Sequence, residues 1–93
     1  MQEKVIEQKL VQTVKTMGGI CPKLVSPGLD GMPDRMVLLP NGRIAFVEVK
    51  RYGEKPDPLQ ASRHRLLRRL GFRVYILDSA DKIGDVLSEI QCP

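Results

Sequence analysis

Two acidic residues and a lysine are spaced so that they can gather at one end of a small β-hairpin. Asp34 lies before a strand-like apolar run, and Glu48 and Lys50 lie at the end of the next one. The two runs flank Pro40-Asn41-Gly42, a tripeptide typical of turns. The pattern therefore predicts two antiparallel strands with an acidic open end.

The length of the turn decides which residues face each other. With Pro40 and Asn41 at the centre of a type I turn and Gly42 as a left-handed bulge residue, the loop has three residues. Counting outward from that loop places Asp34 opposite Glu48. A two-residue loop would instead put Asp34 on the other face of the hairpin.

Facing carboxylates on neighbouring strands predict a metal site. Strand side chains alternate between faces, so Lys50 projects to the same side as Glu48 and its partner Asp34. Like charges in this arrangement destabilise a sheet unless a cation lies between them. Oxygen ligands suit Mg²⁺ or Mn²⁺. The alternative interpretation is a surface hairpin with scattered charges.

A third acidic residue comes from the start of the chain. Residues 2–17 show helical spacing of the apolar residues Ile6, Leu10, Val14 and Met17. Glu7 falls on this apolar face, where an unpaired carboxylate is costly, so it needs a partner. We expect Glu7 to join the acidic site, with Glu3 in reserve near the frayed terminus. The alternative is a salt bridge to a Lys or Arg at the edge of the core.

The remaining elements follow from turn and capping signals. Before the hairpin, we expect a short edge strand within 20–25, limited by Pro22, and then a loop over 26–33. After it, we expect a helix from the N-cap Asp57 to Gly71, a strand over 73–77 and a helix from Ser79 to about residue 90. The order is helix, three strands, helix, strand, helix. A crossover between the third and fourth strands makes them parallel. The prediction is an α/β fold with a mixed four-stranded sheet and helices on both faces.

The helix that starts at Asp57 carries several polar residues of interest. Its predicted apolar stripe consists of Leu59, Leu66, Leu67 and Leu70. Gln60 fits a capping box with Asp57 and also flanks this stripe, from which it can reach the acidic end of the hairpin. Arg63 falls inside the stripe, where it snorkels or reaches a phosphate or a subunit interface. His64, the only histidine, is assigned to the outer side with no catalytic role.

Composition limits the class of protein. With 93 residues, the chain is expected to form a single domain over 1–93, with a thin core that is often stabilised by pairing with a second copy. Cys21 and Cys92 lack metal-ligand spacing and are expected to be free thiols in a reducing compartment. No signal peptide or long apolar segment is evident, so we expect a cytoplasmic protein without a membrane segment.

Positive charge is concentrated in one segment. The stretch 50–73 has eight basic residues against two acidic ones, although the net charge of the whole chain is only +4. Such a field suits nucleic acid, and the alternative is a solvated helix face. The candidate DNA-binding residues are Arg51, Lys55, Arg63, Arg65, Arg68 and Arg69. With few aromatic residues, shape and phosphate contacts are favoured over base stacking.

These motifs together resemble a nuclease family. Pro33-Asp34 followed by Glu48-Val49-Lys50 resembles the PD-(D/E)xK nuclease signature, and the order of elements resembles the restriction-endonuclease-like fold. With Glu7, Ser26-Pro27-Gly28 before Asp34, and Gln60, the chain is similar over nearly its whole length to the virus-type replication-repair nuclease (VRR-NUC) domain. It resembles the stand-alone form found in phages and bacteria.

The resemblance implies a set of metal ligands. Asp34, Glu48 and the main-chain carbonyl of Val49 would hold Mg²⁺ or Mn²⁺. Glu7 would contribute directly or through a metal-bound water.

The resemblance also implies roles in hydrolysis. Lys50 would orient or deprotonate the attacking water and offset the charge on the phosphorane, and Gln60 would help to place Lys50 or the phosphate. The implied function is a metal-dependent DNA endonuclease acting on branched DNA, as a homodimeric Holliday-junction resolvase in a bacterial cell or phage-infected host. The alternatives are a nicking, restriction-type or flap nuclease, or a non-catalytic DNA-binding module.

Overall fold

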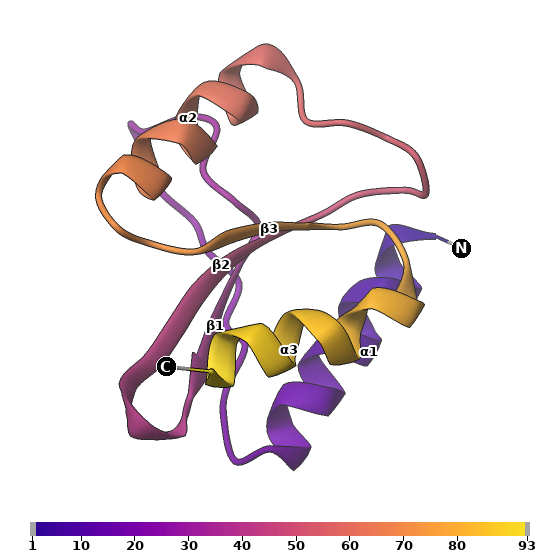
Figure 1. Cartoon of the computed structure of the whole chain (residues 1–93). Coiled ribbons are helices and arrows are strands. Elements are labelled where there is room, and N and C mark those ends of the chain that lie inside the picture. Colours follow the sequence, from indigo (N-terminus) through magenta and orange to yellow (C-terminus); the bar gives the residue numbers. More distant parts are fainter. Residues whose placement is uncertain (1, 93) are drawn as a thin grey trace.

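Three helices and a three-stranded sheet make up the computed structural model, which describes residues 2–92 (Figure 1). The elements are α1 (Glu3–Thr16), β1 (Arg35–Leu39), β2 (Arg43–Val49), α2 (Pro58–Arg69), β3 (Val74–Leu77) and α3 (Ile83–Gln91), with 3₁₀ turns at Pro40–Gly42 and Ala80–Lys82. The strand order is β1-β2-β3. Strand β2 is antiparallel to β1 and parallel to β3, so the sheet is mixed, as the crossover pattern predicted.

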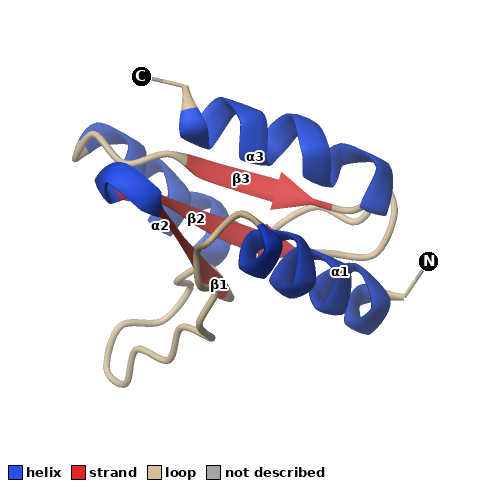
Figure 2. Cartoon of the chain, turned by 90° about the horizontal axis from the view of Figure 1, so that it is seen from below, coloured by secondary structure: helices blue, strands red, loops and turns tan. Residues whose placement is uncertain are grey.

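The helices form a layer on each face of the sheet. Helices α1 and α3 lie on one side and α2 lies on the other (Figures 1 and 2). The main core joins α1 and α3 to alternate strand residues, including Ala45, Val47 and Val49 of β2. A smaller cluster of Phe46, Leu67 and Val74 lies on the α2 side. Alternation along β2 therefore turns Glu48 toward α2.

The predicted register of the hairpin is confirmed. Leu39 pairs with Arg43 across a three-residue loop, and Arg35 pairs with Val47. The turn type is different, because Asn41 has a φ of 68° and therefore takes the left-handed conformation that a type I turn does not use. Asparagine tolerates this conformation better than most residues, so the loop keeps its length and the register is unchanged.

The predicted fourth strand is wrong among the described residues. The segment after α1 makes only two isolated bridges with β1, Ile20 with Leu38 and Lys23 with Arg35. Between them, the Pro22 carbonyl accepts a hydrogen bond from the β1 backbone but its nitrogen has no proton to donate in return. The ladder is therefore interrupted, although the segment still covers the outer edge of β1.

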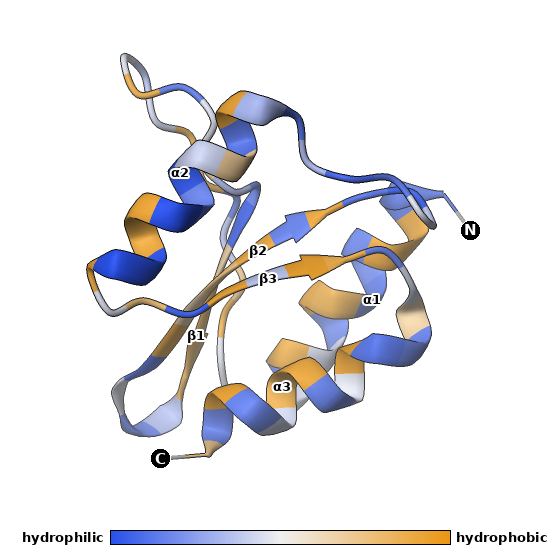
Figure 3. Cartoon of the chain, turned by 45° about the horizontal axis from the view of Figure 1, so that its top comes forward, coloured by the Kyte–Doolittle hydropathy of each residue, from blue (hydrophilic) through white to orange (hydrophobic). Residues whose placement is uncertain are grey.

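Helix α2 begins as predicted, but its buried face matches the predicted apolar stripe only in part. Asp57 and Gln60 form both hydrogen bonds of the capping box. The buried residues are His64 and Leu67, whereas Leu59 is 50% exposed. Figure 3 shows α2 as largely hydrophilic, unlike the strands beneath it. Leu67 is therefore buried as predicted, but the polar His64 is buried beside it, because the sheet face under this helix contains Glu48.

The remaining predictions from composition concern thiols and membranes. Both cysteines are free, as predicted. Burial raises the pKa of the Cys21 thiol to about 11, and the Arg35 guanidinium partly offsets this, so the thiol is protonated and unreactive at neutral pH. None of the helices in the described part of the chain has the length and apolar character needed to cross a bilayer.

Candidate active site

The predicted catalytic residues converge on one pocket at the end of the hairpin. The pocket has a volume of about 270 Å³. Its lining consists of Glu3, Glu7, Lys23, Asp34, Glu48, Val49, Lys50 and Gln60. Four separate parts of the chain supply these side chains: α1, the long segment before β1, the end of β2 and the first turn of α2.

Asp34 is fixed where the loop joins β1. The Val49 N–H donates a hydrogen bond to Asp34 Oδ2 at 2.9 Å. On its other side, the Asp34 carbonyl accepts a 2.8 Å hydrogen bond from the Leu24 N–H. The preceding Pro33 is fully buried. These contacts hold the Asp34 carboxylate across the strand end, next to Glu48.

Glu48 is a buried carboxylic acid held by α2. It is 1% exposed. Gln60 Nε2 donates to Glu48 Oε2 at 3.4 Å, and His64 Nε2 lies 3.3 Å from Glu48 Oε1. Burial, followed by the hydrogen bond with Asp34 and its negative charge, raises the pKa of Glu48 to about 8. Glu48 is therefore protonated at neutral pH unless positive charge stabilises its ionised form.

The position of His64 corrects the prediction that it lies on the outer side. It is 1% exposed and packs against Glu48. Burial lowers the pKa of His64, and the nearby Arg68 and Lys50 charges lower it further, so the ring is neutral at neutral pH. It donates to ionised Glu48 only as the Nε2–H tautomer. His64 lies four residues after Gln60, so both side chains project from one face of the helix. This spacing was the sequence signal that would have revealed the contact of His64 with Glu48.

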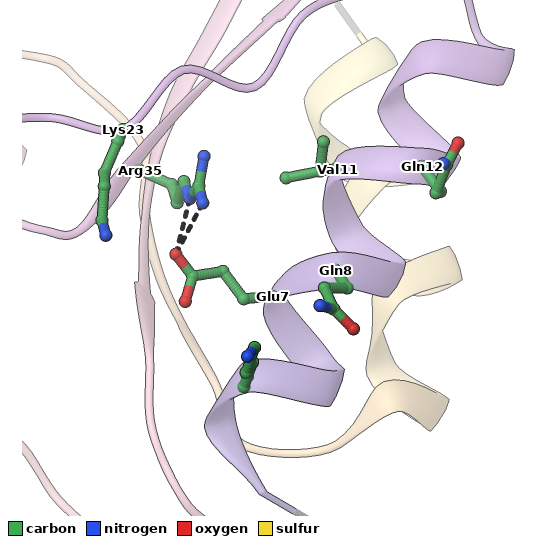
Figure 4. Close-up of a pocket in the computed structure, with 7 residues that line it drawn as sticks. Glu7, Gln8, Val11, Gln12, Lys23 and Arg35 are labelled. Carbon is green, nitrogen blue, oxygen red and sulfur yellow. Dashed lines mark hydrogen bonds and ion pairs between the residues drawn. The ribbon is translucent and has the colours of Figure 1, made fainter.

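Glu7 reaches the pocket from the opposite layer, through an ion pair. Its Oε1 accepts from Arg35 Nε at 2.8 Å and lies 2.7 Å from Arg35 Nη2 (Figure 4). Arg35 also donates from Nη1 to the Cys21 carbonyl at 2.9 Å. Glu7 thus has the salt-bridge partner that the sequence left open as the alternative. Because both Arg35 contacts use Oε1, Oε2 remains outside the ion pair while Glu7 still lines the pocket.

The donor set fits a hydrated divalent cation. Among the described residues, no group of three or more His, Cys, Asp and Glu side chains is placed to hold a metal ion by itself. The pocket offers two adjacent carboxyl groups, those of Asp34 and Glu48. Glu48 stays protonated at neutral pH unless positive charge is added. Mg²⁺ in proteins is commonly bound through one or two carboxylates and keeps several waters. The two carboxylates therefore fit such an ion.

The predicted DNA-binding residues divide into two groups. Arg63 and Arg68 are used within the fold: Arg63 Nε donates to the Asp30 carbonyl at 3.0 Å, and Arg68 Nη2 donates to the Val74 carbonyl at 2.9 Å. Arg68 is nevertheless exposed, as are Arg51, Lys55, Arg65 and Arg69. Of these, Arg51 lines a separate pocket beside the first turn of α1. Five of the six predicted residues are therefore exposed, and the sixth, Arg63, is half-buried.

Comparisons with known proteins place the whole chain rather than single site residues. No family model matches the chain. A curated protein called "Putative nuclease p44", from Acyrthosiphon pisum secondary endosymbiont phage 1, is 53% identical over 81 residues, which is 87% of each chain. A solved structure described as a "VRR_NUC domain" is 33% identical with a TM-score of 0.87, over 92% of this chain and 94% of the other.

Proposed function

This chain belongs to the VRR-NUC family, and from that premise we propose that it is a Mg²⁺- or Mn²⁺-dependent endonuclease that hydrolyses phosphodiester bonds in branched DNA. The observation that carries the proposal is the pocket in which Asp34 and Glu48 adjoin Lys50 and Gln60. Paired carboxylates beside a lysine are the groups that metal-assisted hydrolysis of a phosphodiester requires.

The metal would be held by Asp34, Glu48 and the carbonyl of Val49. When bound, a divalent cation supplies Lewis-acid polarisation of the phosphodiester and lowers the pKa of water. The Val49 N–H fixes one carboxylate oxygen of Asp34, which leaves the other oxygen available as a ligand. Glu7 contributes through Oε2 or through a water, since Oε1 is engaged by Arg35.

His64 and Gln60 act on Glu48 from α2. Their nitrogens approach different oxygens of the same carboxylate, so together they fix its orientation. Partners of this kind, which orient a ligand without binding the metal, typically affect metal affinity or activity 10- to 100-fold. His64 is therefore a positioning residue, and Gln60 combines this role with the capping of α2.

Lys50 is a cationic residue two positions after Glu48. It lines the pocket, and its charge lowers the pKa of Glu48. In hydrolysis it orients the attacking water or accepts its proton, and its ammonium form offsets the charge that develops on the phosphate oxygens. No further base is needed in the pocket for this division of roles.

A symmetrical four-way junction is the proposed substrate, with a homodimer as the active species. Each chain offers one such pocket, and paired cuts on two strands need two pockets related by a two-fold axis. A sedimentation measurement with and without DNA tests the dimer. A 10.5 kDa monomer under both conditions would contradict it.

The test of function is a cleavage assay on matched substrates. A synthetic four-way junction, a linear duplex, a flap and a single strand are incubated in Mg²⁺, Mn²⁺ or EDTA. Glu48→Ala and Lys50→Met are run alongside to exclude a contaminating nuclease. We expect paired symmetrical cuts on the junction with metal, and none with EDTA or Glu48→Ala.

Three other outcomes would redirect the assignment. Equal cutting of all substrates would retain the metal nuclease and remove the junction preference in favour of a nicking, restriction-type or flap enzyme. Full cutting by Glu48→Ala would remove the proposed site. DNA binding that ignores Mg²⁺ apart from salt screening, with no cutting, would indicate a non-catalytic binding module.

A further inference from the structure

A second and larger pocket lies next to the carboxylates, on the α1 side of the sheet. Its volume is about 760 Å³, within the range of about 300–1,000 Å³ typical of ligand sites. It runs between α1 and the segment that leads into β1 (Figure 4), and we call it the α1 groove. Its lining consists of Lys4, Glu7, Gln8, Val11, Gln12, Lys23 and Arg35.

The α1 groove adjoins the proposed catalytic pocket. Glu7 and Lys23 line both. A third pocket, lined by Gln2, Glu3, Lys4 and Arg51, shares Lys4 with the α1 groove and Glu3 with the catalytic pocket. A chain molecule whose reacting group lies at Asp34 and Glu48 therefore has a path into the groove that does not cross the surface of α2.

The charges along the groove favour an anion. Among the described residues that line it, Glu7 is the only acidic one, and the Arg35 guanidinium neutralises it. Lys4 and Lys23 are exposed, and neither forms an ion pair with any residue in the range 2–92. Their ammonium groups thus remain available for a ligand, and the field in the groove is positive.

The neutral groups in the groove indicate which anion fits. Gln8 and Gln12 are exposed one turn apart on α1 and offer amide donors and acceptors. The lining contains no aromatic residue, so the stacking that holds unpaired bases is absent from this part of the described structure. Amides and lysines without aromatic residues are suited to a sugar-phosphate backbone.

We propose that the α1 groove binds the DNA backbone next to the scissile phosphate, with Lys4 and Lys23 as its phosphate contacts. This inference rests on the proposed nuclease function and adds a binding surface outside the basic segment 50–73. The substrate then contacts both helical layers: α2 on one face of the sheet, and the α1 groove on the other.

The test measures DNA binding separately from cutting. Binding of fluorescent junction and duplex DNA is followed by anisotropy in EDTA over a series of salt concentrations. The double variant Lys4→Met/Lys23→Met is compared with Lys9→Met/Lys15→Met, which removes the same charge from exposed α1 positions outside the groove. On a duplex, we expect the groove variant to bind more weakly, with a slope of log affinity against log salt smaller by about 1.8.

The outcomes separate this inference from the proposed function. Equal affinities and slopes for the two double variants would overturn the groove, even if the wild type cuts DNA with metal. A loss of affinity confined to the groove variant would support the groove, even if no substrate is cut and the nuclease proposal fails. In active protein, the groove variant should also raise KM relative to its charge-matched control.

Discussion

Replacing Glu48 by glutamine should change how the stability of the protein depends on pH. The carboxyl is 1% exposed and its pKa is raised to about 8, so the folded state keeps this proton up to mildly alkaline pH. The unfolded chain releases it near the ordinary value of 4.5. A glutamine side chain has a similar size and carries an amide donor in place of the acidic proton, but it does not titrate.

The sign follows from proton linkage. Between pH 4.5 and about 8 the folded state binds one proton more at Glu48 than the unfolded state, so the free energy of unfolding falls as pH rises. Since each pKa unit corresponds to about 1.4 kcal/mol, the loss over this window reaches up to about 5 kcal/mol. That is a large part of the 5–15 kcal/mol that is typical for a domain, so it should be readily measured.

The assay is urea unfolding followed by circular dichroism in EDTA, at intervals from pH 5 to pH 8. We expect Glu48→Gln and the wild type to have similar stability at pH 5, and the variant to be more stable by several kcal/mol at pH 8. Other titrating groups are common to both proteins and largely cancel in the difference. A difference that stays constant from pH 5 to pH 8 would refute the argument that burial and Asp34 hold the proton on Glu48.

Three further predictions concern metal binding and packing. Mn²⁺ affinity should rise about tenfold per pH unit below pH 8 and level off above it, because Glu48 must lose its proton to bind; an affinity independent of pH would contradict this. His64→Ala should weaken metal binding about 10- to 100-fold. His64→Gln should lose less affinity, because it retains a donor near the Nε2 position. Equal losses of metal affinity in the two variants would indicate a merely structural role for His64. Gly19→Ala should destabilise the fold by about 1–3 kcal/mol in urea unfolding, because its Cβ would lie 2.3 Å from the Leu38 carbonyl oxygen. The control is Gly84→Ala in α3, where the added Cβ meets nothing within 4 Å and should stabilise the fold by about 0.5–1 kcal/mol.

The parts of the fold that the sequence predicted well are those governed by local signals. Helix α3 buries the four residues that its spacing indicated, Ile83, Val86, Leu87 and Ile90. The hairpin register followed from the length of its loop, and this register brought Asp34 to Glu48. Capping by Asp57 and Gln60 fixed the start of α2. Each of these features depends on residues close together in sequence.

The parts that were missed depend on tertiary contacts. Helical periodicity predicts the buried face of α2 from the positions of its own apolar residues. The sheet surface that this helix covers, however, includes the buried acid Glu48. His64 therefore turned inward and Leu70 outward. The fourth strand failed at one residue, because Pro22 lacks the N–H that the ladder needs. The α1 groove was not predicted, since Lys4 and Lys23 come to line one pocket only in the folded chain.

Calorimetric titration with Mn²⁺ tests the proposed metal centre at Asp34 and Glu48. Mn²⁺ is titrated into the wild type, Asp34→Asn and Glu48→Gln at pH 8, without DNA. We expect saturable binding by the wild type and loss of that binding in both variants, while urea unfolding shows that they remain folded. Unchanged Mn²⁺ binding in both variants would contradict the assignment of these two carboxylates as metal ligands.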